Sequence, residues 1–352
     1  MSRFCNPKLA SLEAYTPGEQ PQDRTYIKLN TNESPYPPSK GVRKAVAKAT
    51  VDRLRLYCDP NATALKKKLA ELYGAELSEV FISNGSDDIL NFAFLAFGAD
   101  GILFPDISYG FYEVFANLHG LPFQKVALKE DFSIEVNDYC GKGKMVVIAN
   151  PNAPTGRTLT LEEIEKLLKA NPDNVVLIDE AYVDFGGESC VGLTKKYANL
   201  LCVQTFSKSR SMAGARLGFA IGAPELIADL EKIKYSTNPY NVNTLTQAVG
   251  LAALQENEYY MDSCKRIIKS RAYTKKQLEK LGFSVIPSQA NFLFAKSEKI
   301  GGMELYVKLK EKGVLVRHFE KDRIRDYNRI TIGSQKQMQA LITAIKEILG
   351  AC

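Results

Sequence analysis

Short apolar runs recur along the first two thirds of the chain, and stretches with helical spacing lie between them. The runs fall at residues 80–83, 101–104, 145–149, 175–178 and 200–203. Mostly apolar runs of this length are typical of strands that are buried on both faces of a parallel sheet. Segments such as 63–73 and 160–170 repeat their apolar residues with the period of a helix. This alternation predicts an α/β fold with a mostly parallel sheet between helices.

The pattern changes toward both ends of the chain. From about residue 257 a long basic helix is predicted through 281, and short strands follow at 282–286, 290–294, 314–318 and 329–333 before a last helix at 336–349. The first 38 residues are rich in proline, asparagine and other turn residues, which indicates an extended arm. We expect an arm at 1–38 that joins the small domain, a large domain at 39–260 and a smaller α+β domain at 261–352.

Composition and charge narrow the class of protein. The net charge of +6 is mild and spread along the chain, which suits anionic small molecules and argues against a nucleic-acid partner. Polar and glycine residues interrupt the most apolar stretch, 89–104, so we expect no membrane span, and residues 1–18 lack the apolar core of a signal peptide. The seven cysteines are odd in number, with no C-x-x-C pair, and the two histidines have no metal-ligand spacing. We therefore expect a cytoplasmic protein with reduced thiols and no metal site.

The segment from Thr205 to Phe219 concentrates chemistry directly after one apolar run. Lys208 follows two hydroxyl residues at a strand exit, where α/β sheets place their ligands. A lysine there can form a Schiff base with a carbonyl cofactor when it is held deprotonated. Arg216 offers a planar fork for a phosphate, and Thr205 and Ser207 offer hydroxyl donors. Considered alone, the segment also fits a solvated basic loop after a strand.

Four other strand exits carry polar or aromatic groups. Asn84-Gly85-Ser86-Asp87 forms a glycine turn before a helix, which can cradle a phosphate, although Ser86 or Asp87 could equally be an N-cap. Tyr109 can offer a flat face to a flat cofactor or belong to the core. The other two exits are Asn150-Pro151-Asn152-Ala153-Pro154-Thr155-Gly156 and Asp179-Glu180-Ala181-Tyr182. A carboxylate at the end of the last strand can pair with a protonated pyridine nitrogen.

Together these segments resemble the fold-type-I aminotransferases that depend on pyridoxal 5'-phosphate (PLP). The lysine segment is similar to their S-K-x-x-x-x-A-G-x-R-x-G motif, and N-P-N-A-P-T-G and D-E-A-Y are similar to two further family motifs in the same order. The resemblance implies that Lys208 binds PLP and transfers the proton, that Asp179 pairs with the pyridine nitrogen, and that Tyr109 stacks on the ring. Tyr182 and Asn152 would contact the ring oxygen. The residues implied to anchor the phosphate are Ser86, Asp87, Thr205, Ser207, Arg216 and Tyr57 of a neighbouring subunit.

Three further motifs resemble the histidinol-phosphate aminotransferases within that superfamily. They are L-x-x-N-E-x-P at 29–35, where the family usually has asparagine at the position of Ser34, the loop at 55–60 and P-Y-N-V-N at 239–243. The resemblance implies a homodimer with arm contacts between subunits and amine exchange between L-histidinol phosphate and 2-oxoglutarate. The residues implied to bind substrate are Tyr15, Asn32, Asn241, Arg317 and Arg329. An aromatic amino acid aminotransferase and a threonine-phosphate decarboxylase remain alternatives, because specificity lies in the shape of the pocket.

Overall fold

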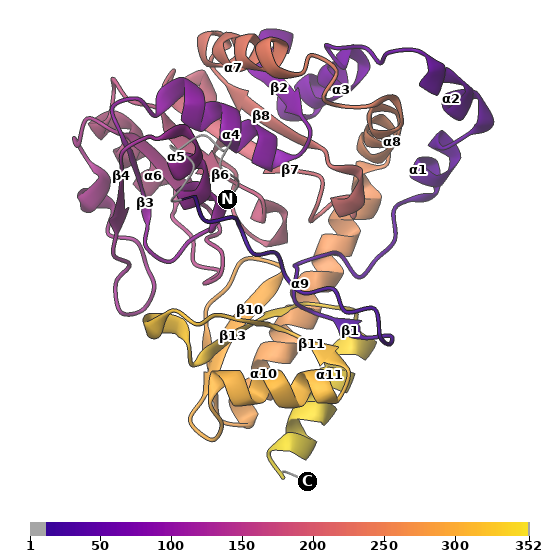
Figure 1. Cartoon of the computed structure of the whole chain (residues 1–352), viewed down its shortest axis with the longest axis vertical. Helices are drawn as coiled ribbons and strands as arrows, with labels where there is room; N and C mark the ends of the chain where they lie inside the picture. The colour runs from indigo at the N-terminus through magenta and orange to yellow at the C-terminus, as the bar shows by residue number, and fades with distance from the viewer. Residues whose placement is uncertain (1–11, 351–352) are drawn as a thin grey trace, which may run out of the picture.

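The computed structural model describes residues 12–350, and a seven-stranded sheet forms the centre of its larger part (Figure 1). The strands are β2 (Val80–Ser83), β3 (Ile102–Pro105), β4 (Phe123–Val126), β5 (Met145–Ala149), β6 (Val176–Asp179), β7 (Leu200–Thr205) and β8 (Gly218–Gly222). Their order across the sheet is β2-β8-β7-β6-β5-β3-β4. Only β8 runs antiparallel to its neighbours within the described part of the sheet. The prediction of a mostly parallel α/β sheet is confirmed.

Helices cover both faces of this sheet, which explains why β5 is apolar throughout and why β6 and β7 become polar only at their carboxyl ends. In β5, Met145 and Val147 pack on one face with α4 (Ser86–Phe97), whereas Val146 and Ile148 pack on the other. Because successive side chains of a strand point to opposite faces, a strand covered on both sides buries all of its side chains, which favours apolar residues along its length. The other helices of this domain are α1 (Lys40–Ala45), α2 (Lys48–Asp52), α3 (Thr63–Tyr73), α5 (Phe111–His119), α6 (Leu161–Ala170), α7 (Pro224–Thr237) and α8 (Thr244–Gln255).

Helix α9 (Asn257–Lys280) runs from the large domain into a smaller one (Figure 1). The smaller domain has a four-stranded antiparallel sheet in the order β12-β13-β10-β9. The strands of this sheet are β9 (Phe283–Ile286), β10 (Phe292–Ser297), β12 (Arg317–His318) and β13 (Tyr327–Thr331). Helices α10 (Gly302–Glu311) and α11 (Gln335–Ile348) also belong to this domain. The long helix expected at 257–281 is therefore present.

The N-terminal arm pairs with the small domain. Strand β1 (Ile27–Lys28) lies parallel to β11 (Val314–Leu315), forming a second small sheet. The sequence predicted one strand at 314–318, and the structure instead divides it: β11 pairs with the arm and β12 pairs with β13. The first eleven residues of the predicted arm lie outside the described residues.

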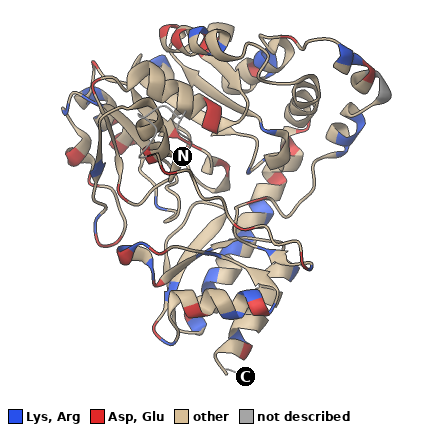
Figure 2. Cartoon of the chain, viewed as in Figure 1, with Lys and Arg blue, Asp and Glu red and all other residues tan. Residues whose placement is uncertain are grey.

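Charged side chains of both signs are interspersed over the two domains, as the mild net charge of +6 suggests (Figure 2). Within residues 12–350, no helix combines the length and the apolar character that a membrane crossing needs.

Candidate active site

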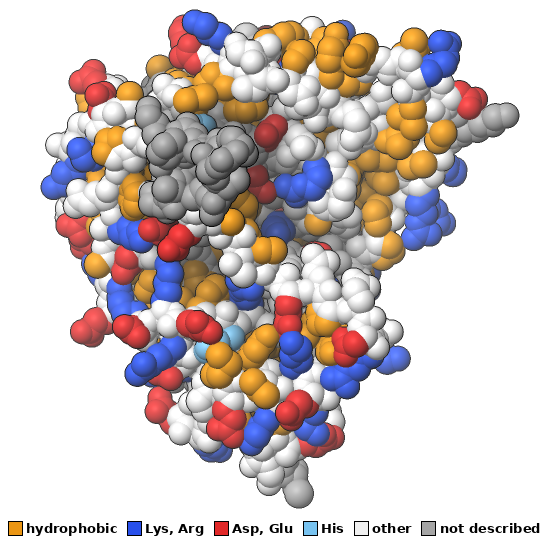
Figure 3. Space-filling model, in the orientation of Figure 1, with side chains coloured by type: hydrophobic (Ala, Val, Ile, Leu, Met, Phe, Trp, Pro, Cys, Tyr) orange, Lys and Arg blue, Asp and Glu red, His pale blue; other side chains and the backbone are white. Residues whose placement is uncertain are grey.

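Most of the residues singled out from the sequence meet where the strands of the large sheet end, in the hollow between the two domains (Figure 3). The strands β6 and β7 are parallel neighbours, so Asp179 and Thr205 reach the same edge of the sheet. The predicted residues that line one small cavity there are Ser86, Asp87, Tyr109, Asp179, Tyr182, Thr205, Ser207, Lys208 and Arg216. Residues that are as many as 130 positions apart (216 − 86 = 130) thus form one polar site.

Lys208 projects into this cavity from the loop between β7 and β8, and hydrogen bonds hold the start of this loop in place. The Phe206 N–H donates to the Leu217 carbonyl at 3.0 Å, and the Ser207 N–H donates to the Thr205 hydroxyl at 3.1 Å. The Lys208 ammonium donates to the Thr31 carbonyl at 3.3 Å and lies 5.8 Å from the centre of the Tyr182 ring. The solvated-loop alternative is wrong, because Lys208 is only partly exposed and its neighbours in the loop are buried.

Asp179 is a buried carboxylate at the floor of the cavity, with 5% of its surface exposed. The Tyr112 hydroxyl donates to it at 2.8 Å and the Ala181 N–H donates at 3.2 Å. Burial raises the pKa of Asp179 to about 6, although these two donors lower it. A carboxylate held in such a place favours a cationic partner, so the site fits the protonated ring nitrogen of PLP.

The start of α4 forms the predicted phosphate cradle together with Arg216. Gly85, with φ +89°, is the N-cap residue, and within the described chain no side chain caps this helix end. The N-cap alternative for Ser86 and Asp87 is therefore wrong. Arg216 donates to Asp87 at 2.8 Å, and a Cβ on Gly85 would lie 2.8 Å from the Arg216 guanidinium. A helix N-terminus beside a guanidinium fits an anionic phosphate.

Tyr109 and Tyr182 form part of the cavity wall, and both are held by neighbours. The Tyr109 hydroxyl donates to Asp87 at 2.8 Å. The Tyr182 hydroxyl accepts from the Asn32 side-chain amide at 3.0 Å, and the Asn32 side-chain oxygen Oδ1 accepts from the Thr331 hydroxyl at 2.9 Å. Asn32 thus connects the arm, the large domain and the small domain at one point.

A larger cavity of about 630 Å³ opens from this site toward the small domain. The predicted substrate residues Tyr15, Asn32, Arg317 and Arg329 all line it. Arg329 donates to the Asn30 carbonyl at 3.0 Å, whereas its Nε is shielded from solvent and has no partner among the described residues. Arg317 instead donates to the Thr16 and Pro17 carbonyls at 3.1 and 3.2 Å, so it holds the arm. Tyr15, beside these carbonyls, stacks on Phe111 at 4.2 Å.

Three predicted residues lie differently from the sequence expectation. The Asn152 amide already donates to the Ile107 carbonyl and the Thr155 hydroxyl, at 2.9 and 3.0 Å, so a ligand would have to replace one of them. Asn241 does not line either cavity, because its amide donates to Ser83 and Asp88 at 2.7 and 2.8 Å beside α4.

Tyr57 is the third of these residues. Its side chain is 84% exposed and stacks on Tyr240 at 4.5 Å, outside the two cavities of its own chain. This position is compatible with a role in a neighbouring subunit and equally with the surface tyrosine considered from the sequence.

Sequence reasoning missed Tyr112, which holds Asp179. Tyr112 is fully buried and occurs in an aromatic-rich helix, so its letter pattern is that of an ordinary core residue. It lies only three residues after Tyr109, in the first turn of α5 (Phe111–His119), and this proximity was the available signal.

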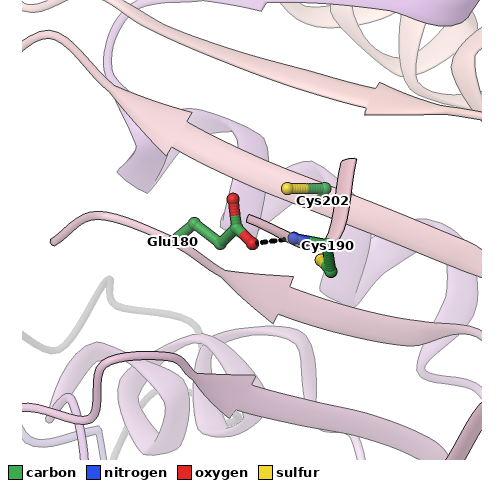
Figure 4. Close-up of side chains that lie close together, drawn as sticks. All are labelled: Glu180, Cys190 and Cys202. Atoms are coloured by element: carbon green, nitrogen blue, oxygen red, sulfur yellow. Dashed lines mark hydrogen bonds between the residues drawn. The ribbon is translucent and has the colours of Figure 1, made fainter. Parts of the chain in front are cut away.

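Glu180, directly after Asp179, lies beside two buried thiols, those of Cys190 and Cys202 (Figure 4). Its carboxylate accepts from the Ser189 hydroxyl at 2.6 Å, the Cys190 N–H at 2.6 Å and the Gln204 amide at 2.8 Å. Protein donors thus satisfy both carboxylate oxygens without a metal ion. Glu180 ties the segment that carries Asp179 and Tyr182 to β7.

Comparison with known proteins gives a consistent answer. Residues 24–345 match the family model for aminotransferase class I and II. The chain is 51% identical to a histidinol-phosphate aminotransferase of Brachyspira hyodysenteriae, with 99% of both chains covered. It is 46% identical to one of Clostridium acetobutylicum, over 99% of this chain and 100% of the other.

Solved structures agree with the fold. The histidinol-phosphate aminotransferase structure from Clostridium acetobutylicum has a TM-score of 0.85 and 26% identity, covering 92% of this chain and 99% of that one. That from Sinorhizobium meliloti, in complex with pyridoxal-5'-phosphate, has a TM-score of 0.88 and 20% identity, covering 99% and 98%. The resemblance stated from the motifs is confirmed: the chain belongs to the class I and II aminotransferases, enzymes that depend on pyridoxal 5'-phosphate.

Proposed function

We propose that this enzyme exchanges the amino group between L-histidinol phosphate and 2-oxoglutarate, producing imidazole acetol phosphate and L-glutamate in histidine biosynthesis. The observation that carries the proposal is the juxtaposition, around connected cavities, of Lys208, the buried Asp179 and an Arg329 whose Nε has no partner within residues 12–350. Relatives that are named histidinol-phosphate aminotransferase, 45–51% identical over nearly the whole chain, support the choice of substrate.

Lys208, Asp179, Tyr182 and Tyr109 are the residues that would hold the PLP ring, and Asn152 would contact the ring oxygen only by giving up its hydrogen bond to Ile107 or Thr155. Its phosphate would be anchored by Ser86, Asp87, Thr205, Ser207 and Arg216. When bound, PLP supplies a carbonyl that accepts an amine and a ring that withdraws electrons from the reacting carbon.

The chain's own residues would supply proton transfer and charge. The Lys208 amine, once free, is the base and acid that moves a proton to and from the substrate carbon. Its present acceptor, the Thr31 carbonyl, orients the side chain without adding charge. Asp179 keeps a negative charge in a place from which water is largely excluded, where its effect on a cationic ring nitrogen is strongest.

Arg329 is the residue that we assign to the anionic group of each substrate. Both substrates present an anion, a phosphate in one half-reaction and a carboxylate in the other, and a guanidinium binds either with charge-assisted hydrogen bonds. Arg317 would contribute by fixing the arm, and Tyr15 and Asn32 by shaping the cavity.

We further propose a two-fold homodimer in the cytoplasm, with the arm at 1–38, the large domain at 39–260 and the small domain at 261–352 as its units. Several exposed apolar side chains, those of Val46, Val51, Leu54 and Leu56, belong to the same segment as Tyr57, and exposed apolar surface of this kind suits a subunit interface. In the dimer Tyr57 would reach the phosphate site of the partner. The free thiols among the described cysteines suit a reducing compartment.

The experiment that tests the substrate is an assay of the purified enzyme with 2-oxoglutarate and three donors: histidinol phosphate, phenylalanine and threonine phosphate. We expect kcat/KM to be highest for histidinol phosphate, with glutamate as the product. A higher value for phenylalanine would instead support an aromatic aminotransferase. Release of carbon dioxide from threonine phosphate would support the decarboxylase.

A further inference from the structure

Arg210 is a buried cation beside the reactive lysine, and no step described so far uses it. Only 2% of its surface is exposed, although arginine is rarely buried so completely. Its guanidinium donates to Asp184 at 3.2 Å, to the Ser209 hydroxyl at 3.3 Å and to Asn257 at 3.1 Å. It also lies 5.3 Å from the centre of the Phe206 ring.

These contacts join three segments that have separate roles in the site. Arg210 itself is in the Lys208 loop. Asp184 is in the 3-10 helix η5 (Val183–Phe185), which follows Tyr182 directly. Asn257 is the first residue of α9, the helix that leads to the small domain. The Arg210 guanidinium therefore connects the loop of Lys208, the loop of Tyr182 and helix α9, which leads to the domain that carries the substrate arginines.

The two residues of the Arg210–Asp184 ion pair each lie close in sequence to a residue of the proposed site. Arg210 is two residues after Lys208, and Asp184 is two residues after Tyr182. A planar guanidinium with several donors can fix the relative position of two loops better than an ammonium can, because its donors have a set geometry. An apolar residue would fill this space without the free-energy cost of removing a charge from water. The buried charge is therefore better explained by the fixed positions of its partners than by a gain in folding free energy.

We infer that Arg210 is a positioning residue for the transamination: it holds the Tyr182 loop and the start of α9 at a set distance from Lys208. The inference rests on the proposed roles of Lys208 and Tyr182. Without Arg210, the tie at Asp184 would be lost, and the hydrogen bonds of Asn32 and Glu180 would be left to set the position of Tyr182, so its hydroxyl would be held less firmly against the bound cofactor. The defect of an Arg210 variant should therefore resemble, and overlap with, the defect of a Tyr182 variant.

The chain offers a matched control in Lys234 on α7. Lys234 is also a buried cation, 3% exposed, and it lies 5.7 Å from the centre of the Phe81 ring. It pairs with Glu231 at 2.8 Å, away from the residues that line the two cavities. Lys234→Met removes a buried charge and its ring contact, so it measures the loss of stability alone.

The test titrates the absorbance of the bound cofactor against pH in the holoenzyme, a readout that does not depend on turnover. Five proteins are compared: wild type, Arg210→Met, Tyr182→Phe, the double variant and Lys234→Met. We expect Arg210→Met to shift the midpoint in the same direction as Tyr182→Phe, by about half a pH unit or more. The double variant should shift by clearly less than the sum, because both changes act on the same hydroxyl. Lys234→Met should lower Tm and leave the midpoint in place.

Two results would overturn the inference. If Arg210→Met lowers Tm as Lys234→Met does but keeps the wild-type midpoint, Arg210 is only structural. If its shift adds fully to that of Tyr182→Phe, it does not act through Tyr182. A Tyr182→Phe enzyme with an unchanged midpoint would contradict the proposed site itself, and the Arg210 inference with it. If Arg210→Met does not fold, Asp184→Asn weakens the same tie from the other side and is judged by the same criteria.

Discussion

Replacing Asp179 with asparagine should have opposite effects on activity and on the stability of the cofactor-free enzyme. The substitution keeps the shape of the side chain and removes its charge. Burial raises the pKa of this carboxyl from 3.8 to about 6, and the Tyr112 hydroxyl and the Ala181 N–H offset only part of that shift. The charge is therefore unfavourable in the folded apoenzyme and is retained for what it does with a cationic ligand.

The magnitude follows from the pKa shift. A shift of about two pKa units corresponds to roughly 3 kcal/mol of folding free energy. Because the folded-state pKa is the higher one, the folded state binds the extra proton between about pH 4 and pH 6. The free energy of unfolding of the apoenzyme should fall as pH rises through that window, and the loss should be complete above it. Asp179→Asn should remove this pH dependence and stabilise the apoenzyme at pH 8 by up to about 3 kcal/mol.

The holoenzyme should show the opposite result. In the holoenzyme the Asp179 carboxylate would pair with the protonated ring nitrogen. Loss of this negative charge should lower kcat by two or more decades, which corresponds to an activation barrier raised by about 3 kcal/mol. The assays are urea unfolding of both apoenzymes at pH 4 to 8 and steady-state kinetics of both holoenzymes. The surface variant Asp262→Asn, whose side chain is 69% exposed, serves as the control and should change neither quantity. An Asp179→Asn enzyme with near-normal kcat, or an apoenzyme that is less stable at pH 8, would refute the reasoning.

Lys208→Ala should lose nearly all turnover but retain some PLP through the phosphate contacts, and borohydride treatment of the wild type should fix the cofactor to a peptide containing Lys208. Arg329→Ala should raise KM for both half-reactions by roughly ten- to a hundredfold, as expected for a charge-assisted contact of about 1.5–3 kcal/mol. Lys208→Ala and Tyr57→Ala, refolded together, should regain activity above the mean of the two, because one site of a mixed dimer would combine native Lys208 and native Tyr57.

Each of these three predictions can be contradicted by a specific result. A reduced label on another lysine would contradict the Lys208 assignment. Arg317→Ala should affect KM less than Arg329→Ala, because Arg317 already binds the Thr16 and Pro17 carbonyls, and equal KM values for Arg329→Ala and wild type would show that Arg329 does not bind the anion. Mixed dimers confirmed by mass but without a gain in activity would rule out the shared site.

The sequence by itself determined the architecture of the large domain and most of its chemistry. Strands buried on both faces are mostly apolar, so β5, β6 and β7 were visible as short apolar runs that become polar, if at all, only at their carboxyl ends. Parallel strands end at one edge of a sheet, so Asp179 and Lys208 could be expected to lie together before any contact was known. These conclusions depend on local patterns and on a general rule of sheet topology.

Only the tertiary structure decided which partners the polar side chains have. Arg317 and Arg329 have similar surroundings in the sequence and both donate to carbonyls of the arm about 300 residues away, yet only Arg329 keeps a buried Nε that has no partner among the described residues. Arg210 and Tyr112 looked like a loop cation and a core aromatic until Asp184 and Asp179 were found beside them. The role of a polar residue depends on contacts between segments far apart in the chain, and a local pattern of apolar and polar positions does not encode such contacts.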